Sequence, residues 1–404
     1  MVAGGDALAH ETSGRPVGEA RPKGKVVFVT GALPGEVVLV EVDDERRDFA
    51  RGHVIEVVDA PSPDRVAPPC VNVAAGCGGC GWQHVALDGQ VRWKEAIVAD
   101  ALRRIARLDG EDGTLPTIST VPAATGGYRT TLRLAVRDGR AAFHEHRGHG
   151  LVDAAGCLVA HPSLASLLDA PFGQARRVML RASVATSERV AWCRPTARGV
   201  ELPRDVVVVD DRAVRRGHGA IAEEVAGRRF RISPGSFFQS GPAAASALAR
   251  AVLDAVPPGV ASVADLYAGV GLFAAVVGEA TGAPVAAVET DPSAAADARV
   301  NLADLDATVV HGEVREWSPP APVDLVVADP ARPGLAAPGV AAVARSGAAR
   351  VVLVSCDPAS LARDTLLLAG AGYRLDRVTL VDTFPHTPHV EAVAVYDGHF
   401  SHDA

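Results

Sequence analysis

The chain has 404 residues, a formal net charge of −8 and 48% hydrophobic residues. That length and apolar content predict two or three domains with sizeable cores, and the negative net charge argues against a chain that binds nucleic acid through bulk charge. No stretch is long and apolar enough to span a bilayer, and the first twenty residues lack the basic start and apolar core of a signal peptide. We therefore expect a cytoplasmic protein with no membrane partner.

The charge is unevenly divided along the chain. Residues 236–404 hold 9 Arg and 19 Asp or Glu, a net of −10, whereas the residues before them carry a net of +2. Five arginines fall within 128–147, namely Arg129, Arg133, Arg137, Arg140 and Arg147. A solvated strand face and a phosphate-binding surface explain this run about equally well.

The predicted elements fall into three regions. Short β-type runs separated by Gly and Pro turns occupy 24–58 and predict a small, barrel-like all-β unit. After a proline-rich linker, 91–108 has apolar residues at helical spacing, and 128–235 alternates as antiparallel strands do. From residue 236 a helix over 243–256 leads into strand–helix repeats with the buried strands SVADL, PVAAVE, DLVVAD and VVLVS, followed by a late, antiparallel VAVY.

Three of the six cysteines gather in one glycine-rich loop, CVNVAAGCGGCGWQH. Cys70, Cys77 and Cys80 are spaced so that their thiolates can converge on one centre, and Cys157 is the natural fourth ligand. Four thiolates suit either a tetrahedral zinc ion or a 4Fe–4S cluster, and a compact group of three with a distant fourth favours the cluster. Cys193 belongs to no motif and is expected to be a core thiol.

A glycine-rich turn follows the first buried strand of the C-terminal region. Gly269 and Gly271 allow the backbone to approach a ligand closely, and Glu289 ends the next strand, where it can bind ribose hydroxyls. The turn alone fits either a nicotinamide dinucleotide or S-adenosylmethionine. The later strand that ends in Asp329-Pro330 is typical of methyltransferases.

The strand VVLVS ends in an unusual place for a cysteine. Cys356 stands at the carboxyl end of this buried strand, and that edge of a parallel sheet is where ligands and reactive groups collect. A buried structural thiol is the commoner explanation for any single cysteine. The residues around Cys356 therefore have to decide between a reactive thiol and a structural one.

Taken together, these motifs resemble one family, the S-adenosylmethionine-dependent RNA 5-methyluridine methyltransferases that carry an iron–sulfur cluster. The resemblance runs in order along nearly the whole chain: a TRAM-like unit at 24–58, the cysteine loop, YRTTLRL, SPGSFFQSGP, DLYAGVGLF, DPARPG, VSCDP and DTFPHTPHVE. The last three are more specific than the glycine turn. Ala331, Asp357 and Leu272 depart from the family pattern, and the first cysteine spacing is one residue longer.

The resemblance implies the fold and its division into domains. It implies an α/β Rossmann-like class I methyltransferase domain over 236–404, an N-terminal OB-like TRAM β-barrel over 1–60 that binds RNA, and a central antiparallel α+β domain over 61–235 that carries the cysteine-rich loop. The substrate would be an unstacked uridine in RNA rather than DNA, with ribosomal RNA favoured over transfer RNA. We expect a monomer.

The resemblance also implies the site residues. The nucleophile would be Cys356, which adds to C6 of uracil, and the base would be Glu391, which removes the C5 proton. S-adenosyl-L-methionine would be bound by Gln239, Tyr267, Gly269, Glu289 and Asp329. The 4Fe–4S cluster, with zinc as the lesser alternative, would be held by Cys70, Cys77, Cys80 and Cys157.

Two alternatives of other classes remain at the level of sequence. An NAD-dependent oxidoreductase would use the glycine turn but leave Cys356, Glu391 and the cysteine loop without a role. A non-catalytic RNA-binding protein with a decayed methyltransferase domain would have no need to keep Cys356 and Glu391. Phe237 and Phe238 could stack on a flipped base, and core packing is expected for at least one of them.

Overall fold

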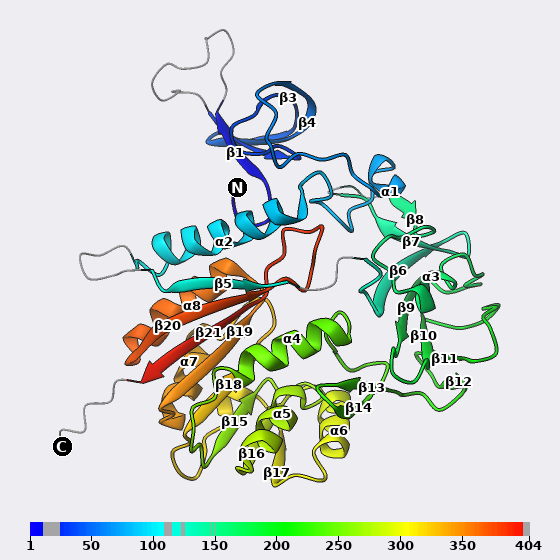
Figure 1. The fold of residues 1–404 in the computed structure, drawn as a ribbon. Coiled ribbons are helices and arrows are strands. Elements are labelled where there is room, and N and C mark those ends of the chain that lie inside the picture. Colours follow the sequence, from blue (N-terminus) through cyan, green and yellow to red (C-terminus); the bar gives the residue numbers. More distant parts are fainter. Residues whose placement is uncertain (11–24, 109–114, 123–125, 147, 149, 399–404) are drawn as a thin grey trace.

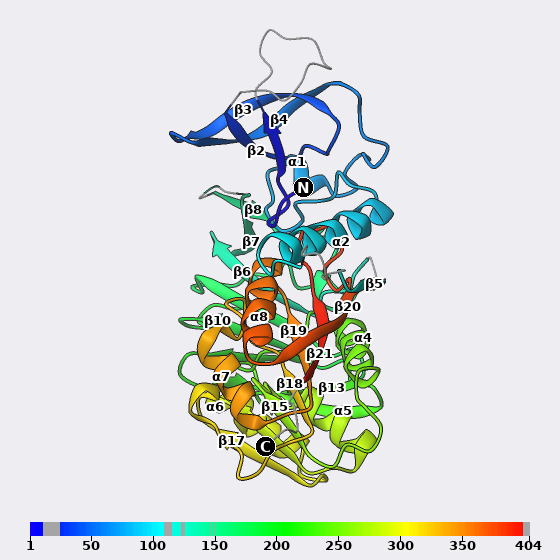
Figure 2. The same ribbon diagram turned by 90° about the vertical axis from the view of Figure 1, so that its left-hand side faces the viewer.

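The computed structural model describes residues 1–10, 25–108, 115–122, 126–146, 148 and 150–398. In Figure 1 an N-terminal strand unit lies at the top, a central sheet at the right and a layered α/β unit below and to the left. Figure 2, turned by 90°, shows the strand unit and the α/β unit at opposite ends of the molecule. No helix in the described part of the chain is long and apolar enough to cross a membrane.

The N-terminal unit is a four-stranded sheet in the order β1-β2-β4-β3. Its strands are β1 (Ala7–His10), β2 (Val26–Thr30), β3 (Val37–Glu45) and β4 (Phe49–Asp59). β2 and β4 run parallel, and the other neighbours are antiparallel. Val29 is fully buried and packs with Val38, Val40 and Val54 in a small core of its own. The all-β unit expected over 24–58 is thus present.

The central sheet has seven strands in the order β12-β11-β10-β9-β6-β7-β8. They are β6 (Thr131–Arg137), β7 (Arg140–His144), β8 (Leu151–Asp153), β9 (Arg177–Ala182), β10 (Arg189–Arg194), β11 (Val206–Asp210) and β12 (Val214–Arg216). Neighbours are antiparallel except for β10 and β11. One face packs on helix α3 (Pro162–Ala165) and on Phe172, and the fully buried Cys193 lies in this core, as expected for an inert thiol.

The α/β unit is built on an eight-stranded sheet in the order β17-β16-β15-β18-β19-β21-β20-β5. Its strands are β15 (Val263–Leu266), β16 (Val285–Glu289), β17 (Ala307–His311), β18 (Leu325–Ala328), β19 (Arg350–Ser355), β20 (Tyr373–Val381), β21 (Ala392–Gly398) and β5 (Thr117–Val121). β15 to β19 are parallel, and β21 pairs antiparallel with β19. The four expected buried strands are present as β15, β16, β18 and β19, and the last expected strand, β21, is antiparallel as predicted.

Helices cover both faces of this sheet, as its continuous apolar strands require. One face packs on α4 (Pro242–Leu253), α5 (Leu272–Thr281) and α6 (Pro292–Asn301); the other packs on α2 (Leu87–Arg104), α7 (Ala336–Ser346), α8 (Pro358–Gly370) and the 3₁₀ turn η1 (Val314–Glu316). Side chains of one strand alternate between the two cores: Val351 and Leu353 face one core, and Val352 and Val354 face the other.

Segments that precede residue 236 also build the α/β unit. β5 extends its sheet by pairing parallel with β20, and Val98 and Leu102 of α2 are buried in one of its cores. The hairpin of β13 (Ile221–Val225) and β14 (Arg228–Ile232) contributes Phe230 to the other core. The central range therefore supplies both its own sheet and part of the α/β unit. Its cysteine loop includes the short helix α1 (Val71–Ala74).

Candidate active site

The parallel strands bring the expected site residues to one rim of the eight-stranded sheet. Tyr267 follows β15, Glu289 ends β16, Asp329 follows β18 and Cys356 follows β19. Because β21 runs antiparallel to β19 with Ser355 paired to Ala392, the residue before β21, Glu391, stands beside the residue after β19. The ladder thus places Cys356 and Glu391 next to each other at the edge where ligands of α/β sheets bind.

The glycine turn is shaped for close approach of a ligand. Tyr267, Gly269 and Gly271 have φ of 65°, 56° and 87°, and Gly271 directly precedes α5. Only glycine adopts this left-handed region without strain, and its missing side chain leaves the helix N-terminus open. The carboxylate of Glu289 accepts bonds from the backbone N–H of Gly269 (2.7 Å) and of Asp291 (2.6 Å), which joins the turn to the end of β16.

A buried carboxyl group behind the turn was not singled out from the sequence. Asp265 of β15 is fully buried, and its Oδ2 accepts a bond from the backbone N–H of Ala274 in α5 (2.7 Å). Burial raises the pKa of this carboxyl to about 8, with the charges of Asp329 and Glu289 acting in the same direction. The only available signal was its position, the first residue of DLYAGVGLF. Asp265 fixes the distance between the strand and the helix that flank the turn.

Cys356 is presented by the start of α8. Asp357 is the N-cap of that helix and accepts a bond from the backbone N–H of Ser360 (2.8 Å), so its carboxylate is used in folding the turn. Cys356 itself is partly buried. Burial, together with the charges of Glu391 and Asp329, raises the pKa of its thiol to about 11, and the guanidinium of Arg332 opposes this rise.

Two carboxyl groups share the rim next to this thiol. Burial and the proximity of Asp329 raise the pKa of Glu391 well above its ordinary value. Burial likewise raises the pKa of Asp329 to about 7, while the amide of Gln239, which donates to its Oδ2 (3.3 Å), opposes the rise. Two carboxylates in one low-dielectric pocket cannot both ionise cheaply, so the pair holds a proton near neutrality.

Gln239 comes from a loop that the α/β unit and the central sheet hold in place. Asp297 of α6 accepts bonds from Ser233 N–H (2.7 Å) and Ser236 Oγ (2.7 Å). From the central sheet, the buried Arg181 donates to the carbonyls of Ser233 (3.0 Å) and Ser236 (2.9 Å). The loop 233–239 is therefore rigid. Its two aromatic side chains differ: Phe238 is buried in the core, and Phe237 is 60% exposed beside Gln239.

The segment that carries Glu391 is tied to α2. The Nζ of Lys94, a lysine that is only 2% exposed, donates to Oδ1 of Asp382 (2.6 Å) and to the carbonyl of Phe384 (3.0 Å). Gln90, on the same helix, accepts a bond from the backbone N–H of His386 (2.6 Å). The Nδ1 of His389, in the same segment, lies 3.0 Å from Nη2 of Arg332.

The same segment is tied to the cysteine region. The backbone N–H of Trp82 donates to the carbonyl of His386 (2.9 Å), and the hydroxyl of Tyr128 donates to the carbonyl of Pro385 (3.1 Å). The guanidinium of Arg129 lies 5.7 Å from the Phe384 ring and also lines the cysteine cavity. The cysteine loop and the rim of the sheet are thus connected through residues 384–386.

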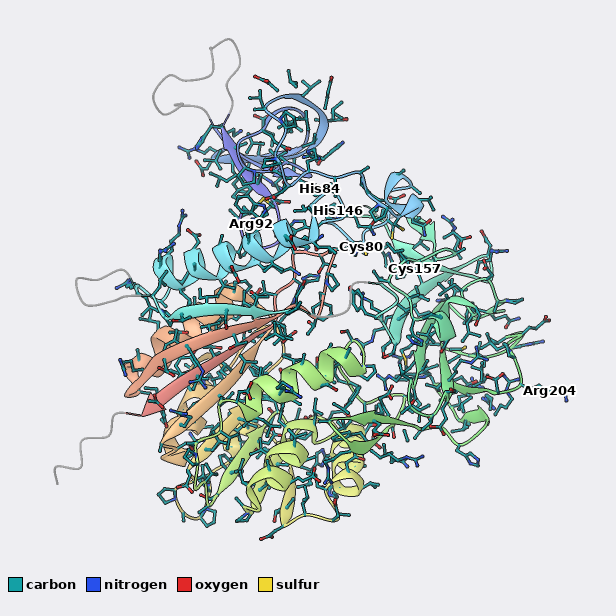
Figure 3. All side chains as sticks on the ribbon, viewed as in Figure 1. Cys80, His84, Arg92, His146, Cys157 and Arg204 are labelled. Atoms are coloured by element: carbon teal, nitrogen blue, oxygen red, sulfur yellow. The ribbon has the colours of Figure 1, made fainter. Side chains whose placement is uncertain are left out.

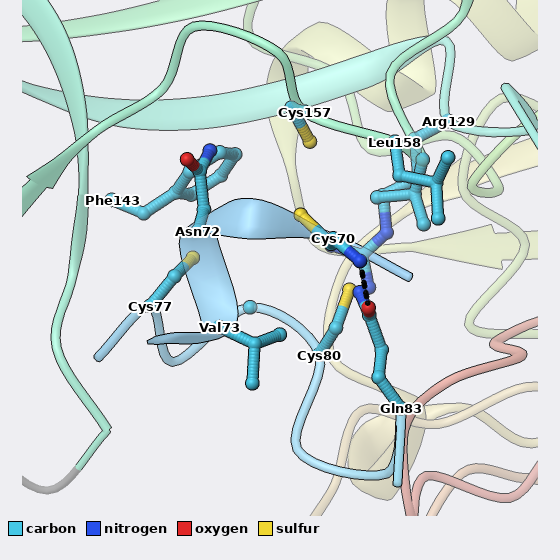
Figure 4. Close-up of a pocket in the computed structure, with 12 residues that line it drawn as sticks. Cys70, Asn72, Val73, Cys77, Cys80, Gln83, Arg129, Phe143, Cys157 and Leu158 are labelled. Atoms are coloured by element: carbon cyan, nitrogen blue, oxygen red, sulfur yellow. Dashed lines mark hydrogen bonds between the residues drawn. The ribbon is translucent and has the colours of Figure 1, made fainter. Parts of the chain in front are cut away.

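The four expected ligand cysteines line one cavity. Cys70, Cys77 and Cys80 approach it from the loop and Cys157 from the opposite side, with their sulfurs turned into the space between the two segments (Figure 4). All four are free thiols. Within the described ranges, no three His, Cys, Asp or Glu side chains lie close enough to hold a single metal ion.

Burial dominates the electrostatics of this cavity. It raises the pKa of the Cys77 and Cys157 thiols and takes that of Cys80 to about 11, and the thiols reinforce one another. Arg129 lowers the pKa of both Cys80 and Cys157. A positive centre in the cavity would convert these thiols to thiolates, as metal coordination does.

The fold and the rim define a methyltransferase-type α/β enzyme with an added N-terminal unit, and comparison with known proteins agrees. The TRAM domain model matches residues 17–55. An uncharacterized RNA methyltransferase of Streptomyces coelicolor is 36% identical over 93% of this chain and 88% of its own. The 23S rRNA (uracil(1939)-C(5))-methyltransferase RlmD of Methylococcus capsulatus is 32% identical over 97% and 96%.

A solved structure extends this agreement to three dimensions. The Pyrococcus abyssi tRNA (uracil-54, C5)-methyltransferase, in complex with S-adenosyl-L-homocysteine, superposes with a TM-score of 0.71. It is 26% identical, and the match covers 92% of this chain and 97% of that one. This chain belongs to the family of S-adenosylmethionine-dependent RNA uracil-C5 methyltransferases. The alternative of a dinucleotide oxidoreductase is thereby set aside.

Proposed function

We propose that this protein methylates C5 of a specific uridine in RNA through a covalent adduct between Cys356 and C6 of the base. The observation that carries the proposal is the pairing of Ser355 with Ala392, which sets a thiol and a buried carboxyl group side by side at the mouth of the glycine turn. One group adds to the ring and the other removes a proton from the neighbouring carbon. That division of labour is what substitution at an unreactive C5 requires.

The reaction is written as follows. The Cys356 thiolate adds to C6, which makes C5 a carbon nucleophile; S-adenosylmethionine supplies the methyl group and the positive charge beside the thiol. After C5 is methylated, Glu391 takes the C5 proton, the electron pair re-forms the C5–C6 double bond, and the sulfur is expelled. The products are 5-methyluridine, S-adenosylhomocysteine and one proton.

Glu391 and Asp329 have separable tasks in this scheme. Glu391 acts as base only after losing its own proton, and its raised pKa makes it a stronger base than an exposed carboxylate. Asp329, held by Gln239, is placed to orient the uracil or the methyl donor. The exposed Phe237 is the candidate for stacking on the flipped base, since Phe238 is occupied in the core.

We further propose that Cys70, Cys77, Cys80 and Cys157 hold a 4Fe–4S cluster. The support is the donor set: four thiols line one cavity, three of them from a single loop and the fourth from a distant segment, which is the ligand pattern that such a cluster takes. A tetrahedral zinc ion, with Zn–S bonds of about 2.3 Å, is the lesser alternative for four thiolates. Anaerobically purified protein should contain about four irons per chain and lose them in Cys80→Ser; stoichiometric zinc without iron would contradict this assignment.

Ribosomal RNA is the substrate class that we favour over transfer RNA. The support is that the RlmD relative, named for 23S rRNA, is 32% identical to this chain, whereas the tRNA enzyme of known structure is 26% identical. We propose that the protein acts as a monomer in the cytoplasm.

Trapping with 5-fluorouridine tests the mechanism. Fluorine at C5 cannot leave as a cation, so RNA that carries 5-fluorouridine at the target site should form a stable complex with the wild-type protein in the presence of S-adenosylmethionine. Cys356→Ala should form none, while Cys193→Ala, which removes a thiol from the central core, should trap normally. Trapping by Cys356→Ala would overturn the nucleophile assignment.

A further inference from the structure

The charges of the three regions differ in a way that bears on how RNA is held. Residues 1–60 contain 7 basic and 11 acidic residues, and residues 236–404 contain 9 and 19, so both regions are net negative. Residues 61–235 contain 24 basic and 18 acidic residues. The central-sheet segment 128–218 alone holds 15 arginines against 9 acidic residues and accounts for the whole excess. An RNA backbone is therefore attracted to the central sheet.

Strand register places several of these arginines on one face of that sheet. Leu132, Leu134, Val178 and Leu180 point into the central core, so the residues between them point the other way. On that outer face Arg133 lies opposite Met179, and Met179 lies opposite Trp192. We call this row, with its neighbours Arg177 and Arg194, the arginine face.

The arginine face includes a repulsion between like charges that the packing of the sheet does not explain. Arg177 and Arg194 are directly opposite each other across β9 and β10, an arrangement of like charges that destabilises a sheet. Arg194 is partly neutralised by Asp211 (2.7 Å), but within the described part of the chain Arg133 and Arg177 have no acidic partner and are exposed. A polyanion laid along this face would relieve the repulsion.

A hollow lies beside this face. Trp192 and Arg194 line it from the sheet, with the guanidinium 4.7 Å from the indole ring, and Ser233, Pro234 and Gly235 line it from the α/β unit. The hollow has a volume of about 450 Å³. The same rigid loop continues within four residues to Phe237 and Gln239 at the active site. The loop that lines the hollow therefore also carries residues of the active site.

We infer that the arginine face and this hollow bind the single-stranded RNA that flanks the target uridine, with phosphates along Arg133 and Arg177 and a base stacked at Trp192 and Arg194. Interleaved arginine and aromatic side chains are the usual means of holding unpaired strands, because guanidinium and indole planes both stack on bases. Asp210 and Asp211 also line the hollow, so a base fits there better than a phosphate. This inference rests on the proposed function for the identity of its ligand.

Equilibrium binding of a fluorescent oligouridylate tests it. The double variant Arg133→Gln/Arg177→Gln should weaken binding by at least about fivefold and lower the slope of log affinity against log salt by about 1.4, since each lost phosphate contact on a single strand is worth about 0.7. The matched control is Arg204→Gln/Arg299→Gln, which removes the same charge from two exposed arginines, one in the loop before β11 at the outer end of the central unit (Figure 3) and one on α6.

The possible outcomes distinguish a failure of the inferred RNA-binding surface from a failure of the proposed methyl transfer. Equal losses in the two pairs, or equal competition by an RNA duplex, would overturn the inference. Oligouridylate should also quench tryptophan fluorescence more in the wild type than in Trp192→Phe, and equal quenching would count against the stacking site. If the wild type binds in this arginine-dependent way but transfers no methyl group to any RNA, the surface stands and the proposed function fails.

Discussion

The rim of the eight-stranded sheet and the cysteine cavity hold the two sets of candidate functional side chains, and they are built in different ways. At the rim, most of the candidate residues end, follow or precede a strand whose backbone pairing fixes them, as Ser355 and Ala392 fix Cys356 and Glu391. At the cavity, the four cysteines come from loops and turns with only the four-residue helix α1 among them. The rim is preorganised by the sheet, whereas the cavity depends on what it binds.

The two regions are nevertheless connected. Residues 384–386 receive hydrogen bonds from Trp82 and Tyr128 on the cysteine side and from Lys94 on α2, and they lead directly to Glu391. Variants of the rim should therefore remove activity and leave stability intact. Variants of the connection should remove stability first.

The largest effect is expected at the nucleophile. Cys356→Ala should reduce methyl transfer by about 10⁶-fold, the scale on which enzymes lose rate when a covalent nucleophile is removed. Its thermal midpoint should stay within about 2 °C of the wild type, because the side chain is small and only partly buried. Rate measurements with radiolabelled methyl donor, beside a melting curve, check both parts; a large drop in stability would show that the rim is not preorganised.

A smaller loss is expected at the base. Glu391→Gln should slow turnover by about 10²- to 10⁴-fold, the usual contribution of a general base. Because the C5 proton then stays in place, the methylated protein–RNA adduct should accumulate and be visible by mass spectrometry. The wild-type rate should rise with pH through the raised pKa of Glu391, and this dependence should disappear in the variant. An unmethylated adduct in the variant would place Glu391 before methyl transfer instead of after it.

The connection between α2 and the segment before Glu391 is tested at Lys94. Lys94→Met leaves Asp382 buried without its partner and should lower the free energy of unfolding by about 3–5 kcal/mol. The control, Arg104→Ala on the same helix, removes an exposed ion pair with Asp100 and should cost about 0.5 kcal/mol or less. Chemical denaturation measures both. Equal effects would mean that the segment before Glu391 is held by other contacts.

A further prediction concerns Asp265 and pH. Its carboxyl has a pKa of about 8 in the folded chain and about 4 when unfolded, so its contribution to stability is complete below pH 4 and is lost as pH rises toward 8. Asp265→Asn removes that titration, and its stability should fall less steeply over this pH range than that of the wild type. Parallel curves of unfolding free energy against pH would contradict the assigned burial.

Some of these features could be predicted from the sequence, and others could not. Four of the buried strands and the late antiparallel strand β21 could be predicted from apolar runs, because a parallel sheet covered on both faces leaves that pattern, whereas the order of the strands in the sheet could not. The apolar run before Cys356 places that residue at the rim, whereas Glu391 was expected only from the resemblance to the methyltransferase family.

What could not be foreseen depended on contacts between distant segments. Lys94 reaches Asp382 across 288 positions, and β5 joins the far edge of the α/β sheet, neither of which leaves a local signal. Asp357 departs from the family pattern, and only the structure shows that its carboxylate caps α8. Asp265 could not be singled out from the sequence because a single acidic residue near a strand end is common.

The central claim, methylation of uridine C5 in RNA with Cys356 as nucleophile, is tested most directly by mapping 5-methyluridine in total RNA. Cells that lack the gene should miss the modification at one site, the wild-type gene should restore it, and the gene for Cys356→Ala should not. An unchanged 5-methyluridine map in the deletion, or full restoration by Cys356→Ala, would contradict the account.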